Sequence, residues 1–134
     1  MKIEHTYSRL IKILENELDS ISGNYTMISA TLNNHNDIIS IGRNSYTKTH
    51  PLQSKYCLKV GSMRNREYLH AEIAALVKTR KDPISIIVIR MTRNGNIRMA
   101  RPCNICQLAI KEAGIRYIYY SGNDGALHLE EIHY

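Results

Sequence analysis

With 134 residues, of which 43% are hydrophobic and 22% charged, the chain has the composition of a globular protein and the length of one domain over 1–134. This balance excludes a disordered chain, and the lack of a long uncharged apolar run excludes a membrane-spanning helix. The formal net charge of +6 favours anionic partners, although solvated surface lysines would explain it equally well.

The cysteines and the N-terminal segment lead us to expect a cytoplasmic protein without membrane contact. Three cysteines cannot all pair within one chain, and Cys103 and Cys106 have a spacing typical of metal ligands in a reducing compartment. The segment MKIEHTYSRLIKILENELDS carries acids through its apolar stretch and lacks a small-residue cleavage site, so it is expected to belong to the fold.

Hydrophobic periodicity predicts a helix and then a β-hairpin at the start of the chain. Apolar residues recur at helical spacing over about residues 5–19, with charged residues on the opposite face. Two β-prone runs, at 26–32 and 38–41, flank the turn-forming segment NNHND and predict antiparallel strands. Gly42 is expected to end the second strand.

A long loop and a helix are predicted in the middle of the chain. Residues 43–68 are polar and contain Pro51 and Gly61, and long connections in compact domains are usually lids or binding loops. Within this segment 52–60 has the pattern of a short helix, and the apolar spacing that follows predicts a further helix over about 69–80.

Strands and helices alternate in the last third of the chain. The apolar run 84–89 predicts a strand covered on both faces, and Pro102 is expected to open a helix that Gly114 closes. Runs at 116–120 and 126–133 predict two final strands, and the short turn between them requires antiparallel pairing. This order predicts an α/β fold, a mixed sheet with helices on its faces.

Two short motifs carry the chemistry, HAE at 70–72 and PCNIC at 102–106. Zinc prefers imidazole nitrogen and thiolate sulfur in a tetrahedron, and a catalytic site keeps one position open for water. His70, Cys103 and Cys106 supply three such ligands and leave that position. Both motifs fall at predicted helix N-termini, where exposed amides and the helix dipole favour thiolates.

Glu72 lies two residues beyond His70, so it can stand beside a metal-bound water without acting as a ligand. Zinc lowers the pKa of such a water to about 7, which lets a carboxylate accept its proton and return it later. The competing interpretation is a closed structural site, which normally has four protein ligands. Cys57 is the only obvious fourth ligand, and a lone cysteine is more often a small buried apolar residue.

These motifs make the region from about Gly42 to Gly114 resemble the cytidine and deoxycytidylate deaminase superfamily of zinc-dependent base deaminases. The resemblance implies a three-layer cytidine deaminase-like fold, with a mixed five-stranded sheet and helices on both faces. It implies an enzyme that hydrolyses cytosine to uracil in a free nucleoside or nucleotide, with zinc-bound hydroxide as nucleophile and Glu72 as proton shuttle. The antiparallel final hairpin is similar to the branch of free cytidine deaminases and several deaminase toxins.

Substrate contacts are expected near the metal ligands. Asn44 is similar in position to an Asn that contacts the sugar or base in this superfamily, although an Asn after Gly42 also fits an ordinary turn. In relatives the residue at Ala71 offers backbone hydrogen bonds to the base. Tyr46 is a stacking candidate because the chain has no Phe or Trp, and Pro102 adjoins the ligands. Three loop residues would bind phosphate if the loop folds over the pocket: Lys48, His50 and Arg64.

Besides deamination of a free cytosine nucleoside or nucleotide, two other functions stay open. A deaminase of single-stranded DNA or RNA would account for the net charge and the basic loop, because its target base enters the pocket unpaired. A zinc-containing nucleotide-binding module without activity would keep the metal ligands but has no need of Glu72. The zinc motif also leaves open which amino-base and which sugar are recognised, and whether the chain forms homo-oligomers, as relatives often do.

Overall fold

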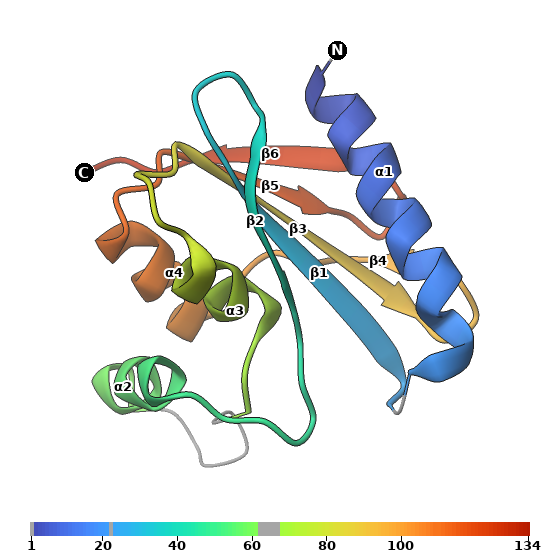
Figure 1. Ribbon diagram of the computed structural model, residues 1–134, viewed down its shortest axis with the longest axis horizontal. Helices are drawn as coiled ribbons and strands as arrows, with labels where there is room; N and C mark the ends of the chain where they lie inside the picture. Colours follow the sequence, from blue (N-terminus) through green and yellow to red (C-terminus); the bar gives the residue numbers. More distant parts are fainter. Residues whose placement is uncertain (1, 22, 62–67) are drawn as a thin grey trace.

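The computed structural model describes residues 2–21, 23–61 and 68–134, which form a mixed β-sheet with helices on both faces (Figure 1). The helices are α1 (Lys2–Glu17), α2 (Pro51–Lys59), α3 (Ala71–Lys78) and α4 (Asn104–Glu112), and the 3-10 helix η1 (Leu18–Ser20) follows α1. The strands are β1 (Tyr25–Leu32), β2 (Ile38–Arg43), β3 (Ser85–Thr92), β4 (Ile97–Arg98), β5 (Tyr117–Ser121) and β6 (Leu127–Glu131). Among these described residues, none of the helices combines the length and the apolar character that a bilayer crossing requires.

The strand order is β2-β1-β3-β5-β6, and the short strand β4 pairs with β3 beside this path. Strands β3 and β5 are parallel, whereas β1 is antiparallel to both of its neighbours and β6 is antiparallel to β5. The predicted mixed sheet of five strands and its antiparallel final hairpin are therefore confirmed, with β4 as a two-residue addition.

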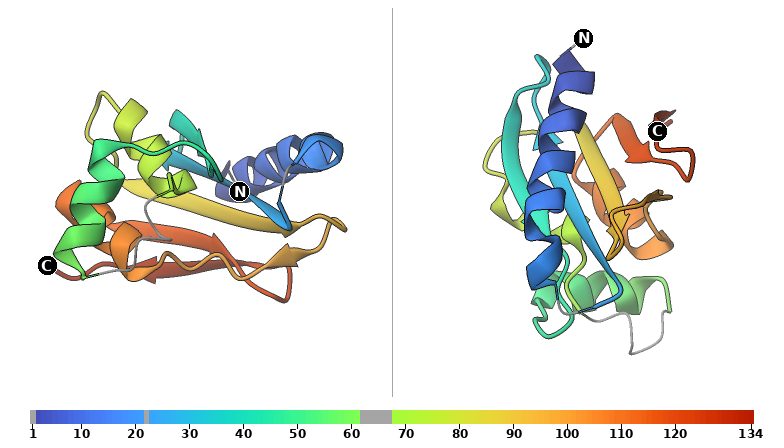
Figure 2. Two further views of the ribbon diagram at one scale, coloured as in Figure 1. Left: turned by 90° about the horizontal axis from the view of Figure 1, so that it is seen from below. Right: turned by 90° about the vertical axis from the view of Figure 1, so that its right-hand side faces the viewer.

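The side chains of the central strand β3 alternate between the two faces of the sheet, and each set packs against the helices on its side. Ile87 and Ile89 belong to the apolar cluster beneath α1, whereas Ile86 and Val88 belong to the cluster beneath α2, α3 and α4. Successive side chains of a strand point to opposite faces, so one apolar strand serves both cores. The right-hand view of Figure 2 has α1 in front of the sheet and the other helices behind it. The expected three-layer α/β arrangement is confirmed.

The prediction that Gly42 ends the second strand is wrong. Strand β2 continues through Gly42, which pairs with Ser29 of β1, and ends at Arg43. A Cβ atom on Gly42 would lie 2.2 Å from the backbone nitrogen of Ala75 and 2.4 Å from the carbonyl oxygen of Ala71. The glycine therefore lets α3 pack directly on β2, a tertiary contact that the local sequence does not reveal.

Replacing Gly42 by alanine should lower the free energy of unfolding by about 1–3 kcal/mol or more, because the added methyl meets helix backbone that cannot rotate away. Urea unfolding followed by circular dichroism measures the change. Ile39→Val is the matched control, since it alters the same strand at a half-buried position and adds no atom. A Gly42→Ala protein as stable as the parent would show that the close approach of α3 is not required.

Candidate metal centre

The two sequence motifs lie at the N-termini of α3 and α4, as predicted. His70 and Cys103 are the N-cap residues of these helices, which contact each other on the same face of the sheet (Figure 1). Pro102 does not open α4 as expected, because Cys103 keeps an extended backbone with φ −69° and ψ 171° and the helix begins at Asn104. Pro102 instead immediately precedes the N-cap residue of α4.

The three predicted metal ligands converge. The Nδ1 atom of His70 lies 3.6 Å from Sγ of Cys103 and 3.3 Å from Sγ of Cys106, and all three atoms lie within 4.8 Å of one another. Tetrahedral zinc, with bonds of about 2.0–2.3 Å to these atoms, places nitrogen and sulfur ligands about 3.5 Å apart. The donor set and its spacing therefore fit a metal ion of the zinc type. Cys57 is outside this group in the part of the chain that the structure describes.

The surroundings shift the pKa values of the two thiols in opposite directions. The hydrogen bond with Cys106 is the main cause that lowers the pKa of Cys103 to about 3, and the hydrogen bond with His70 acts in the same direction. Burial raises the pKa of Cys106 well above the ordinary thiol value, and its hydrogen bond with Cys103 adds to this shift. Thiolates are the metal-binding form, so the lowered pKa of Cys103 favours metal binding, and a bound cation would favour the thiolate of Cys106 as well.

Glu72 lies in the first turn of α3 with only 3% of its surface exposed. Burial raises the pKa of its carboxyl above the ordinary value, although a hydrogen bond to its own backbone and the nearby imidazole of His70 act against this shift. The carboxyl also has a hydrogen bond with the side chain of Cys106. Glu72 is thus next to the ligand group without being counted in it.

The start of α3 is held from two sides. The side-chain oxygen Oε1 of the fully buried Gln53 in α2 accepts a hydrogen bond of 3.1 Å from the backbone nitrogen of His70. The backbone nitrogen of Ser45 donates to the carbonyl oxygen of Leu69, and that of Leu69 donates to the carbonyl oxygen of Lys48, both at 2.9 Å. These bonds fix the backbone from which the His70 imidazole projects.

A cavity of about 340 Å³ opens above the metal ligands. His70, Glu72 and Cys103 lie at its wall, together with Asn44 and Tyr46. The remaining lining residues come mostly from β1, from β3 and from the segments before α3 and α4: Tyr25, Met27, Ser45, Tyr68, Leu69, Arg90, Met99, Ala100 and Arg101. The two motifs thus form part of one concave site, the usual setting for small-ligand chemistry.

Asn44 and Tyr46 are fixed in this wall. The side-chain oxygen Oδ1 of Asn44 accepts a hydrogen bond of 2.8 Å from the backbone nitrogen of Met27. The hydroxyl of Tyr46 donates to the carbonyl oxygen of Tyr25 at 2.8 Å, and the two rings meet edge to face with centroids 5.7 Å apart. Gly23 provides room for the Tyr46 ring, since a Cβ there would lie 2.3 Å from it.

The other residues predicted to contact substrate are not among the described residues that line this cavity. Ala71 and Pro102 are buried beside the ligands but do not line the cavity. Lys48 and His50 line a neighbouring hollow next to α3, and Nδ1 of His50 accepts a hydrogen bond from the backbone nitrogen of Leu52, which caps α2. Arg64 lies outside the described residues.

Sequence reasoning missed Arg90 and Arg101, which both line the cavity. Arg101 forms a two-pronged ion pair with Glu130 of β6, with both N–O distances at 2.8 Å. Arg90 is the only charged residue of β3, whose other residues are Ser, Ile, Val, Met and Thr. A lone cation in an otherwise uncharged strand was the available signal.

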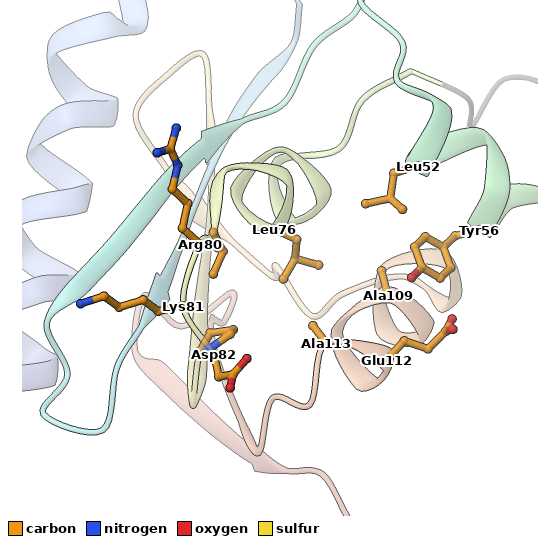
Figure 3. Close-up of a pocket in the computed structure, with 11 residues that line it drawn as sticks. Leu52, Tyr56, Leu76, Arg80, Lys81, Asp82, Ala109, Glu112 and Ala113 are labelled. Atoms are coloured by element: carbon orange, nitrogen blue, oxygen red, sulfur yellow. The ribbon is translucent and has the colours of Figure 1, made fainter.

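A second cavity, of about 280 Å³, lies between α2, α3 and α4 and holds none of the motif residues (Figure 3). Leu52, Tyr56 and Leu76 form part of its apolar floor, and charged residues such as Arg80 and Glu112 stand at its margin.

Zinc binding should depend on Cys103 and not on Cys57. We expect one zinc ion per chain for the parent and for Cys57→Ala, and an affinity reduced by more than about tenfold for Cys103→Ala, which removes a ligand thiolate. Competition with a coloured chelator measures the affinities. If Cys57→Ala lost zinc as fully as Cys103→Ala, the site would be a closed one with four ligands.

Comparison with known proteins adds no family assignment. No model of a protein family matches this chain, and no curated protein matches it significantly.

Proposed function

We propose that the protein is a zinc-dependent hydrolytic deaminase of the cytidine deaminase superfamily, which converts cytosine to uracil in a free nucleoside or nucleotide. The observation that supports this most strongly is a buried carboxyl, Glu72, beside three convergent metal-binding atoms at the wall of one cavity. Cys103 and Cys106 are not joined in a disulfide, which fits the reducing, cytoplasmic compartment in which such an enzyme would work.

The ligand set would hold the ion with one position left for water, since three protein side chains occupy a tetrahedron incompletely. A zinc ion bound there would supply a Lewis acid that lowers the pKa of a water molecule to about 7. Glu72 would take one proton from the attacking water and deliver it to the ring nitrogen. It would then carry the second proton, from the new hydroxyl group, to the amine, which leaves as ammonia. The direction of its pKa shift suits both steps, because raising the pKa of a carboxyl moves it toward neutral pH, where general acid–base groups work best.

The side chain of Glu72 is already held in place, so the reaction would not have to pay an entropy cost for ordering it. It stands in the first turn of α3, two residues from His70, and its own backbone and Cys106 hold the carboxyl by hydrogen bonds. Burial also removes bulk water from the carboxyl, which strengthens its electrostatic effect on a reacting group. The helix that delivers one metal ligand thus also delivers the proton carrier at a fixed distance.

The wall of the cavity has groups that would contact a planar base and its sugar. The side-chain oxygen of Asn44 already accepts a hydrogen bond from the backbone of Met27. Its NH₂ group, which also has a hydrogen bond with Tyr46, would donate to a hydroxyl of the substrate. The rings of Tyr25 and Tyr46 form a rigid aromatic corner at the same wall. Aromatic faces stack on any base, so they favour a nucleobase without selecting one.

Deamination of single-stranded DNA or RNA is the second candidate. Tyr46 and Tyr68, with 38% and 47% of their surfaces exposed, stand at the same cavity, where they would stack on bases flanking the target. The net charge of +6 would attract a polyanion. Ammonia release from nucleosides, nucleotides and short oligonucleotides compares the two candidates directly.

Glu72→Gln should keep zinc and lose activity by about 10²–10⁴-fold, because the amide cannot accept and return a proton. Ammonia release with a panel of cytosine nucleosides and nucleotides, alongside zinc content, measures both effects. Glu112→Gln in α4 is the matched control, since that exposed carboxylate pairs with Lys59 and does not line the metal cavity. An active Glu72→Gln protein would refute the assigned proton route, and no ammonia from any substrate would refute the function itself.

A further inference from the structure

Arg90 shares a face of β3 with the residues that underlie the metal helices. Ile86 and Val88 pack in the core beneath α3 and α4, and the two-residue period of a strand places Arg90 on the same face. At Arg90 the sheet extends past this core, and its side chain lines the cavity that His70 and Glu72 also line. A cation therefore reaches the metal cavity from its sheet side.

The guanidinium of Arg90 is held in position but has no acidic partner among the described residues. Its central carbon stands 4.3 Å from the centroid of the Tyr25 ring, a cation–π contact that orients the group. Its Nε atom is buried and has no hydrogen-bond partner in the part of the chain that the structure describes. No hydrogen bond or ion pair to a described residue engages the rest of the guanidinium, and a cation without such a partner at a cavity wall is suited to an acceptor from outside the chain.

Two other arginines, Arg101 at the cavity wall and Arg43 at the end of β2, are already paired with carboxylates. Arg101 makes its two-pronged contact with Glu130, and Arg43 makes an ion pair with Glu17. Glu72 is the only acidic residue among the described lining residues, and it belongs to the chemistry at the metal. Among the described residues, no acidic side chain pairs with Arg90 at the cavity. The anionic group of a ligand would balance its charge.

We infer that the substrate is a cytosine mononucleotide and that Arg90 binds its phosphate, which makes Arg90 the residue that selects a nucleotide over a nucleoside. This inference rests on the proposed function. Arginine presents a planar set of donors that matches the oxygens of phosphate, so one well-placed guanidinium recognises this group with high specificity.

A mononucleotide fits these observations better than a strand. Binding of a strand uses a row of cations along a groove, whereas the described lining of the cavity offers one unpaired guanidinium and a second one engaged by Glu130. The cavity volume of about 340 Å³ is within the range of sites for small ligands. The phosphate site is therefore placed on β3 and not at Lys48 and His50, which line the neighbouring hollow.

Binding of products tests the inference independently of turnover. Isothermal titration calorimetry compares uridine with uridine monophosphate on zinc-loaded parent, Arg90→Gln, Arg90→Lys and Arg98→Gln. Arg98 is the matched control because it pairs with Arg90 across β3 and β4 but is exposed and does not line the cavity. The parent and Arg98→Gln should bind the monophosphate about 10–100-fold more tightly than the nucleoside, as expected for a charge-assisted hydrogen-bonded pair.

Arg90→Gln should reduce this preference to less than about threefold, and Arg90→Lys should retain part of it, because lysine keeps the charge but not the planar donors. Arg90→Lys also guards against a general folding defect at this position. Equal affinities of the parent for the two ligands would overturn the inference, as would a loss of preference in Arg98→Gln equal to that in Arg90→Gln. Tighter binding of a short uridine oligonucleotide than of the monophosphate by the parent would overturn the choice of a mononucleotide.

Deamination assays separate this inference from the proposed function. If the parent deaminates cytidine and its monophosphate equally well and Arg90→Gln does the same, the phosphate site is refuted while the deaminase remains. If no cytosine compound is deaminated but the calorimetric contrast at Arg90 persists, the deaminase is refuted, and the phosphate-binding role of Arg90 stands.

Discussion

The site depends on one geometric constraint: two helices must begin within a few ångströms of each other on the same face of the sheet. His70 and Cys103 cap these helices, and Cys106 follows one turn later, so the convergence of the ligand atoms is set by helix placement. Close packing at Gly42 seats α3 on β2, and Gln53 holds its first residue. A small error in either contact would open the gap between an imidazole nitrogen and two sulfurs.

The elements and the ligand group were predictable from sequence because each follows from a local pattern. Spacing gave the helices and strands, and the pairing of HAE with PCNIC indicated a nitrogen and two sulfurs at adjoining helix starts. The errors arose where a tertiary contact overrides the local signal. Gly42 was interpreted as a breaker but lies inside a strand, and Pro102 precedes the helix that it was expected to open.

Substrate contacts were the least predictable part, because proximity in sequence to a motif does not determine which side chains share a cavity. Arg98 lies nearer in sequence to PCNIC than Arg90 does, yet only Arg90 lines the metal cavity, and Lys48 and His50 in the loop line the neighbouring hollow. The difference arises from the sheet. Strand β3 passes directly beneath the ligands, whereas the loop residues turn toward the outer side of α3.

The charged groups at the cavity link the stability of the fold to ligand binding. A buried carboxyl at Glu72 and a guanidinium at Arg90 without an acidic neighbour among the described residues both oppose folding to some degree. Each of these groups is stabilised by an opposite charge or a proton that a ligand or metal ion would supply. Folding stability and binding are therefore linked, and ligands that complete the site should stabilise the fold by mass action.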